Sequence, residues 1–379
     1  MLKFTLSPYD VLYFGSGRPF NRGDVVDSVF PPYPHTFAGA ICSKFKNINA
    51  TSILKAVYGP FIKKDTMIYF PKPFNIYSER KKQEHNKFFV VKPLEKKLNL
   101  FDLQNTNKPA EVESLPTYKG TEEIEAFDGF ISIVGLKKWL NGQELNKYDI
   151  LDYKEIFKNE PRVGISIEST LYSVGSKEDA LYRIEFLRLK ENFEFVFWAE
   201  FDFSDELKKV DLKDDKALCD FFNQVPQGLK LGGEMRNVHY DVEVNDFKDY
   251  IIKNLGIDEN IDLDKNEKIQ LLFLTYGIFD FCDSEKRIPQ IDSFKMFSAC
   301  YGNYRIVGLS SKNLRIDRLT KRAYPPGTVF WLESNNGKKG LKAISFLTKS
   351  NNSSYCIEEE KGGQQDFIGA NLVLIKKGG

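Results

Sequence analysis

Alternating strand and helix patterns predict an α+β fold for this chain of 379 residues. Two stretches support the prediction. From Phe195 to Val244 the pattern is strand, helix, glycine loop and strand, and from Leu2 to Phe70 it is strand, helix and strand. Joined in chain order, they give the βαββαβ order of a ferredoxin-like, or RRM-like, unit. We therefore predict one such module over residues 1–244.

The first half of this module has strands on both sides of a helix. Leu2–Phe14 is predicted as a strand interrupted near Pro8, and Met67–Phe70 as a second strand. In Thr36–Asn47 apolar residues recur at helical spacing, which predicts the helix between them. We expect a short additional helix over Ser52–Tyr58.

The second half begins with the clearest strand pattern in the chain. In Phe195–Phe203 four Phe and one Ala alternate with other residues, so one face of the strand is apolar. Asp215–Val225 is then predicted as a helix, Gly228–Gly233 as a glycine loop, and Asn237–Val244 as the last strand.

Two other regions complete the domain organisation. Residues 75–160 are polar and charged without a sustained apolar period, so we interpret them as an insertion in the first module. Residues 245–379 form a smaller α+β module, which begins with a helix over Phe247–Leu255. Strands are predicted in Ile269–Phe281, Tyr304–Leu309 and Thr328–Leu332. This pattern allows a second ferredoxin-like unit.

Charge is balanced overall but segregated along the chain. Lys and Arg number 54 and Asp and Glu number 53, so net charge does not indicate a polyanionic partner. Residues 72–97 carry eight Lys or Arg against three Glu, and residues 312–322 carry five against one Asp. Such segregation permits a basic RNA-binding face on a neutral protein, although charged runs usually mark only solvated faces.

Cysteine usage and hydropathy restrict the class of protein further. The five cysteines are widely spaced and include no CxxC pair, which argues against a disulfide framework and a thiolate zinc site. No apolar run reaches the roughly 18 residues of a membrane helix, and the N-terminus does not resemble a signal peptide. We expect a cytoplasmic protein with no membrane partner, bound metal or cofactor.

The segment from Gly15 to Phe45 has the composition of a phosphate-binding loop. Arg18, Asn21 and Arg22 lie among three glycines, where the backbone turns tightly and guanidinium groups can bind phosphate in a bidentate way. The helix that follows would present its N-terminus beside this loop. An ordinary connection between strand and helix is the alternative, with Arg18 paired to a nearby aspartate.

Four blocks of the chain together resemble the third subunit of the Cmr complex, the type III-B CRISPR effector, whose subunits include RAMP-superfamily proteins. The first block combines Tyr13-Phe14, Gly17-Arg18-Pro19-Phe20 and the run from Phe30 to Ala40. The others are Pro161-Arg162-Val163-Gly164-Ile165 with Leu181-Tyr182-Arg183, then Leu231-Gly232-Gly233-Glu234-Met235-Arg236, and Tyr324-Pro325-Pro326-Gly327-Thr328-Val329-Phe330-Trp331. The blocks occur in the family's order and span most of the chain.

The resemblance implies a fold, a role and partners. It implies two ferredoxin-like RAMP modules, the first with an insertion, and a non-catalytic subunit that holds the 5′ handle of the CRISPR RNA in antiviral defence. It also implies contacts with the large palm-domain subunit, with the first backbone subunit of the RNA filament and, indirectly, with target RNA. The C-terminal stretch from Gly362 to Gly369 matches the family's glycine loop imperfectly.

The predicted RNA-binding residues come from four parts of the chain. They are Arg18, Asn21 and Arg22 in the first loop, His35, Thr36 and Lys44 in the first helix, Arg162 and Arg183 in a hairpin arm, and Gly232, Gly233 and Arg236 in the glycine loop. Tyr33, Phe37, Tyr182 and Tyr240 are candidates to stack on bases, although any single aromatic residue is more often part of a core.

We predict no catalytic residue. The chain lacks GxxxxGK[ST], HExxH and Gly-Gly-Asp-Asp motifs. The alternative is a metal-independent RAMP endoribonuclease that processes CRISPR precursor RNA, with His35 as general acid or base. Such a reaction needs a second titrating group and a cation for the phosphorane, and no motif selects them.

Overall fold

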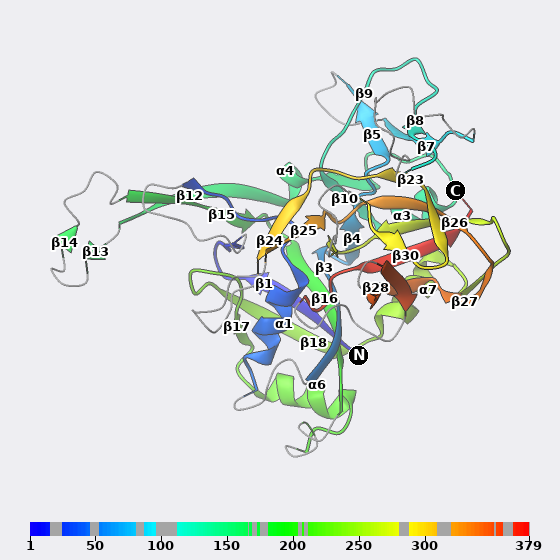
Figure 1. The fold of residues 1–379 in the computed structure, drawn as a ribbon. Coiled ribbons are helices and arrows are strands. Elements are labelled where there is room, and N and C mark those ends of the chain that lie inside the picture. The colour runs from blue at the N-terminus through cyan, green and yellow to red at the C-terminus, as the bar shows by residue number, and fades with distance from the viewer. Residues whose placement is uncertain are drawn as a thin grey trace.

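The computed structural model describes most of the chain in separate ranges. These are residues 1–15, 25–45, 53–80, 87–95, 112–165, 167–168, 173–174, 181–203, 207, 211–279, 288–308, 320–351, 354–358 and 367–378. The fold is a strand-rich mixture of α and β structure with few helices over these residues (Figure 1).

An eight-stranded sheet forms the first half of the molecule. Its order is β11 (Ile150–Asp152), β10 (Gly129–Ser132), β4 (Met67–Pro71), β3 (Leu54–Lys64), β16 (Phe193–Phe201), β1 (Leu2–Pro8), β18 (Asn237–Val244) and β17 (Gly228–Lys230). Among the four central strands β3, β16, β1 and β18, each neighbouring pair is antiparallel. Helix α1 (Pro34–Cys42) follows β1 in the chain and α6 (Asp215–Gln224) follows β16, so this core has the predicted βαββαβ order.

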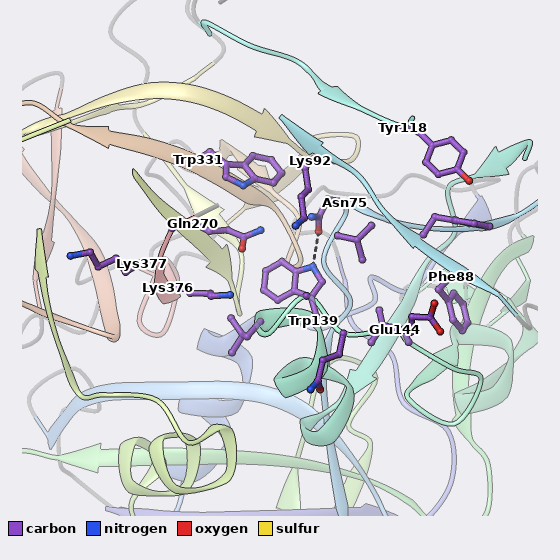
Figure 2. A pocket seen from close by; sticks show the side chains of 17 residues that line it. Asn75, Phe88, Lys92, Tyr118, Trp139, Glu144, Gln270, Trp331, Lys376 and Lys377 are labelled. Carbon is purple, nitrogen blue, oxygen red and sulfur yellow. Dashed lines mark hydrogen bonds between the residues drawn. The ribbon is translucent and has the colours of Figure 1, made fainter. Parts of the chain in front are cut away.

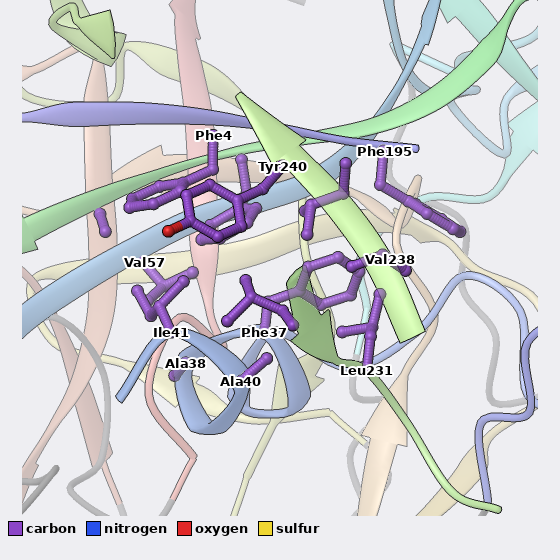
Figure 3. Packing of buried hydrophobic residues seen from close by; sticks show 14 of the residues in the cluster. Phe4, Phe37, Ala38, Ala40, Ile41, Val57, Phe195, Leu231, Val238 and Tyr240 are labelled. Atoms are coloured by element: carbon purple, nitrogen blue, oxygen red, sulfur yellow. The ribbon is translucent and has the colours of Figure 1, made fainter. Parts of the chain in front are cut away.

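Both helices cover one face of this sheet. Phe195 and Phe197 of β16 point to this face and pack with Phe37 of α1, with ring centroids 5.5 and 5.3 Å apart. Figure 3 shows α1 directing Phe37 and Ile41 into this core. The alternation predicted for this strand is therefore confirmed, and truncation of a buried ring such as Phe37 would cost about 3–5 kcal/mol.

One predicted element of the first half is wrong. The expected short helix over Ser52–Tyr58 is the start of strand β3, as far as the structure describes it. Val57 of β3 packs in the core beneath the helices, whereas Tyr58 packs in the core on the opposite face. A strand buried on both faces has a continuous apolar run, and such a run does not distinguish a short helix from a strand.

The predicted insertion supplies part of the first sheet. Strands β10 and β11 extend the sheet beyond β4, and α3 (Ile133–Leu140) packs beside them. Ser132 caps this helix by accepting a hydrogen bond from the Gly135 N–H at 3.0 Å. Small sheets form a separate lobe above the body in Figure 1: β5 (Ile76–Glu79) with β6 (Phe88–Val90) and β9 (Ile124–Glu125), and β7 (Lys92–Pro93) with β8 (Pro116–Thr117).

A seven-stranded sheet covers the other face of the first. Its order is β22 (Gln290–Ile291), β29 (Ser354–Glu358), β28 (Ile344–Asn351), β30 (Leu372–Lys377), β20 (Lys268–Phe273), β26 (Val329–Ser334) and β23 (Phe294–Cys300). Trp198 of β16 shares a core with Trp331 of β26 and with Phe247 of helix α7 (Phe247–Leu255). The strand order is not that of a βαββαβ unit, so the second ferredoxin-like module is not confirmed. The two-stranded sheet of β19 (Asn260–Leu263) and β27 (Lys338–Lys342) lies against it.

A long hairpin projects from the body as the predicted arm. It consists of β12 (Phe157–Ile165), which follows the one-turn helix α4 (Tyr153–Ile156), and β15 (Leu181–Leu189), with β13 (Ile167–Glu168) and β14 (Ser173–Val174) at its far end (Figure 1). Strand β2 (Val25–Val26) pairs in parallel with β15 part-way along the arm. Three further strands, β24 (Arg305–Gly308), β25 (Thr320–Tyr324) and β21 (Gly277–Ile278), form a sheet near α1.

Candidate functional site

A pocket of about 370 Å³ lies along the outer side of helix α1. We call it the glycine pocket. It is lined by Phe14 and Gly15 after β1, by Thr36, Gly39, Ala40 and Ser43 of α1 and its C-cap, and by Lys230, Gly232 and Gly233 of the glycine loop. Most of these side chains are small, and the only charged one among them is that of Lys230. Such a surface lets an anionic backbone approach the polypeptide closely.

The glycine loop requires glycine at its centre. Gly232 has φ +76°, and a Cβ atom there would lie 2.2 Å from the carbonyl oxygen of Tyr13. The next N–H, that of Gly233, donates a hydrogen bond to the same oxygen at 2.8 Å. The loop is therefore fixed against the end of the first strand segment, and this contact holds one wall of the pocket.

Gly39 forms an open part of the opposite wall. A Cβ atom at this helical position would meet no heavy atom within 4 Å. Thr36 lies one turn earlier on the same side of α1, and Ser43, the C-cap residue, lies one turn later. The helix thus presents a flat, small-residue surface to the pocket.

The arginine-rich loop lies outside the described residues. Arg18, Asn21 and Arg22 all belong to it, so their positions stay predictions. Its two described ends are informative. Gly15 lines the glycine pocket, and Val25 pairs with Arg183 part-way along the arm. The loop therefore starts at the pocket and ends at the arm.

His35 lies away from the glycine pocket, at the covered end of α1. Its ring stacks on Tyr33 with centroids 5.4 Å apart and meets the edge of Phe367 at 5.9 Å. Burial lowers the pKa of His35 to about 4, so the imidazole is neutral at physiological pH. The expected exposed N-terminus of this helix is wrong, because Pro34 is buried beside Gly369 of the C-terminal region.

The other residues predicted on the first helix have different surroundings. Thr36 lines the pocket. Lys44 instead donates to the carbonyl of Pro226, and its ammonium lies 5.4 Å from the ring centroid of Tyr240. Tyr33, Phe37 and Tyr240 are at least 97 % buried, so they are not available to stack on bases. Tyr182 of the arm is partly exposed.

Arginines also gather at the base of the arm, in a group that we call the arginine cluster. It contains Arg162, Arg188 and Arg236 with Asp10 and Glu160, next to the ring of Phe186. Arg162 donates to Asp10 at 3.0 Å and to Glu160 at 2.6 Å. Arg188 donates to the same two carboxylates at 2.7 and 2.6 Å. These arginines are thus largely neutralised within the protein.

Arg236 belongs to the same cluster but is held differently. Its guanidinium lies 4.6 Å from the ring centroid of Phe186, and Nη1 is 3.7 Å from Asp10. Its Nε is buried and has no hydrogen-bond partner among the described residues. Burial opposes ionisation of Asp10, but hydrogen bonds from Arg162 and Arg188 outweigh it and lower the pKa of this carboxyl. Asp10 is therefore ionised at neutral pH.

Arg183 lies on the outer face of the arm, apart from the arginine cluster. It donates to Glu185 at 3.1 Å, and its side chain is 49 % exposed. Its neighbours across the sheet are Val163 and Val25, which are 66 % and 63 % exposed. This part of the arm is available for contact with another molecule.

The structure therefore brings only part of the predicted site together. Thr36, Gly232 and Gly233 line one pocket, whereas Arg162 and Arg236 belong to an ion-paired group. Lys230, Gly39 and Ser43 also line the pocket and were not among the predicted contacts. The alternation of β17, which buries Leu229 and exposes Lys230, is the signal that could have identified Lys230.

In the described part of the chain, no group of three His, Cys, Asp or Glu side chains is placed to hold a metal ion. Among the same residues, no helix is long and apolar enough to cross a membrane.

Comparisons with known proteins indicate the family. A structural comparison finds a chain of a type III-B Cmr-beta complex bound to cognate target RNA and AMPPnP, with 17% identity and a TM-score of 0.47, covering 87% of this chain and 86% of that one. A chain of the type III-A Csm3–Csm4 subcomplex matches with 11% identity and a TM-score of 0.38, covering 90% and 99%. A search of curated proteins gives no match.

A family model shows the family. The model described as CRISPR-associated protein (Cas_Cmr3) matches residues 4–377, which is nearly the whole chain. This chain belongs to the Cas_Cmr3 family of CRISPR-associated proteins.

Proposed function

We propose that this protein is a non-catalytic RNA-binding subunit of a type III-B CRISPR effector complex. It holds the 5′ handle of the CRISPR RNA in the glycine pocket and along the loop that leads from this pocket to the arm. It links the large palm-domain subunit to the first backbone subunit of the filament, meets target RNA only indirectly, and acts in the cytoplasm in antiviral defence. Family membership supports the assembly, and the chemistry of the pocket supports the RNA contact.

The observation that carries the proposal is the composition of the glycine pocket. Gly39, Gly232 and Gly233 remove side chains where a phosphate backbone would approach, and Lys230 supplies a positive charge beside them. Arg18 and Arg22 follow Gly15 in the chain and would add guanidinium groups. Contacts of this kind fix the position of an RNA strand, whereas base contacts set its sequence.

The packing of the two sheets supports recognition at this pocket. RRM-type domains commonly stack bases on aromatic residues of an open sheet face. Here the face of the first sheet opposite the helices is covered, because Trp198 and Tyr58 are buried against the second sheet. RNA would therefore bind at the side of α1 and at the loops.

The environment of His35 favours a non-catalytic role. Its imidazole lies between two aromatic rings with a pKa of about 4, which leaves it with no proton to give as a general acid at neutral pH. Lys230 is the only titratable residue among those that line the glycine pocket. RNA held there would be bound without being cut.

Binding of handle RNA by the purified full-length protein tests the proposal. Labelled CRISPR RNA with the handle and the same RNA without it would be compared by gel shift, without metal, for the wild type and for R18A/R22A. We expect handle-dependent binding that the double variant loses, and no cleavage. If the isolated protein gives no shift, the same comparison is made in the reconstituted complex.

Two outcomes would contradict the proposal. The first is equal binding of RNA with and without the handle in the assembled complex. The second is cleavage of repeat RNA that His35→Ala abolishes, which would make the protein a processing endoribonuclease.

A further inference from the structure

A second pocket, of about 440 Å³, lies where the predicted insertion meets the second sheet (Figure 2). We call it the tryptophan pocket. Its walls include Trp139 of α3, Trp331 of β26, Gln270 of β20, Lys376 of β30, Lys92 of β7 and Phe88 of β6. It shares no lining residue with the glycine pocket. Pockets of this size at junctions between structural units commonly bind small molecules.

The floor of the tryptophan pocket is held rigidly. Trp139 donates from Nε1 to Asn75 Oδ1 at 3.1 Å, and Asn75 donates from Nδ2 to the carbonyl of Val91 at 3.1 Å. Asn75 is fully buried, and Trp139 and Trp331 are 5 % and 1 % exposed. A ligand would meet a preformed surface and would not have to order these side chains.

Two lysines point into the pocket, and neither forms an ion pair with Glu144, the one carboxylate among the lining residues. Figure 2 shows Lys92, Gln270 and Lys376 directed toward the region around the ring of Trp139. Within the described residues, neither Lys92 nor Lys376 forms an ion pair, whereas the adjacent Lys377 is held by Glu267 at 2.8 Å. Burial and, next, the charge of Lys92 lower the pKa of Lys376. A bound anion would relieve this repulsion.

Aromatic side chains line the pocket beyond the lysines. Phe88, Phe89 and Tyr118 come from the small lobe, and each is partly exposed. In Figure 2, Phe88 and Tyr118 lie on the other side of Trp139 from Lys376. The amide of Gln270 both donates and accepts hydrogen bonds. The pocket therefore offers cations at one end and rings at the other.

We propose that the tryptophan pocket is a nucleotide-binding site, separate from the RNA surface. The phosphate of the nucleotide binds Lys92 and Lys376 through charge-assisted hydrogen bonds. The base packs against the rings of Phe89 and Tyr118, whose centroids are 5.2 Å apart, because aromatic side chains stack on any base. This assignment goes beyond the proposed holding of the CRISPR RNA handle and does not depend on it.

Tryptophan fluorescence gives a direct test, since two of the three tryptophans of the chain line this pocket. The full-length protein would be titrated with AMP, adenosine and inorganic phosphate, and the affinities confirmed by calorimetry. We expect AMP to quench the fluorescence and to bind at least tenfold more tightly than adenosine or phosphate alone. Lys376→Met and Lys92→Met should each weaken AMP binding by roughly tenfold.

Lys342→Met is the matched control, because Lys342 does not line the pocket and its ammonium is already paired with Glu259 at 2.8 Å. We expect AMP affinity within about twofold of the wild type for this variant. Handle-RNA binding by Lys376→Met should also equal that of the wild type, which separates this site from the RNA surface. Absence of AMP binding, AMP no tighter than phosphate, or AMP binding unchanged in both Lys376→Met and Lys92→Met would overturn the proposal.

Discussion

The glycine pocket and the arginine cluster differ in how much positive charge they offer to another molecule. The arginine cluster contains three guanidinium groups, yet Asp10 and Glu160 already bind two of them and Phe186 covers the third. The glycine pocket contains a single lysine, and no ion pair of Lys230 is found among the described residues. The arginine cluster thus has more cationic side chains than the glycine pocket, but its positive charge is less available to another molecule.

This difference shows what determines an RNA contact. A guanidinium group in an internal ion pair gains little by exchanging a carboxylate for a phosphate, because the charge is already compensated. In the glycine pocket, no carboxylate of the described residues is paired with Lys230, so none competes with an RNA phosphate for this cation. We therefore expect the backbone of the RNA to follow α1 and the glycine loop more closely than the base of the arm.

Replacement of Gly232 should have the largest effect, because the position needs both a left-handed backbone and a missing side chain. Gly232→Ala would place Cβ 2.2 Å from the Tyr13 carbonyl at φ +76°. We expect a loss of about 3 kcal/mol or more in the free energy of unfolding, measured by chemical denaturation.

Gly39→Ala on the opposite wall is the control for this variant. Its Cβ would enter open space in a helix, so we expect stability equal to the wild type or higher by up to about 1 kcal/mol. Equal stabilities for Gly232→Ala and the wild type would show that the loop does not depend on this contact.

The pH dependence of stability should identify the environment of His35. Its pKa is about 4 in the folded protein and near its ordinary value when unfolded, so only the unfolded chain takes up a proton as the pH falls from about 6.5 to 4. The folded state therefore loses stability over this window, by about 2 kcal/mol.

His35→Phe should remove that contribution, because Phe keeps the stacking on Tyr33 and does not titrate. The measurement is chemical denaturation of both proteins at pH 7 and pH 4.5. Parallel pH profiles for the variant and the wild type would contradict a neutral imidazole covered by Tyr33 and Phe367.

Lys230→Met should weaken handle binding moderately, since it removes one phosphate contact. We expect about a threefold loss of affinity and a salt dependence shallower by about one unit of slope, measured by gel shift at several salt concentrations. Lys3→Met is the matched control, because Lys3 is paired with Glu243 at 2.8 Å on the first strand. An equal effect of both variants would argue against a specific contact by Lys230.

Asp10→Asn should have the smallest effect. It tests the comparison of the two sites by changing the arginine cluster instead of the glycine pocket. Arg162 and Arg188 each lose one carboxylate, so more positive charge becomes available at the base of the arm. We expect handle RNA to bind about twofold more tightly. Asp258→Asn, an exposed position after α7, changes the net charge equally and should leave the affinity unchanged. A tenfold gain for Asp10→Asn would show that the arginine cluster is the main RNA surface.

Much of the first module was predictable because its elements have distinct patterns. The alternation of apolar residues identified β16, and helical spacing identified α6 and α7. Strand β3 was missed because its apolar residues do not alternate along the sequence and Gly59-Pro60 interrupts the run. Helix α3 was missed because its eight residues lie within a long polar stretch.

The candidate site was predictable only in part, for a different reason. The sequence identifies Thr36, Gly232 and Gly233 through motifs, and the structure places all three at one pocket. It does not reveal that Arg162 meets Asp10, because 152 positions separate them and only the pairing of the arm with the first strand segment brings them together. Residue type alone does not tell an available cation from a compensated one.

The most direct test of the glycine pocket changes Gly39, where a side chain enters the pocket without disturbing the fold. Handle-RNA affinity would be measured for Gly39→Glu, Gly39→Ala and Val134→Glu, a control carboxylate at an exposed position of helix α3. We predict that Gly39→Ala and Val134→Glu bind as the wild type does and that Gly39→Glu binds at least tenfold more weakly, because its carboxylate repels the RNA phosphates. Wild-type affinity in a folded Gly39→Glu protein would contradict the placement of the RNA in this pocket.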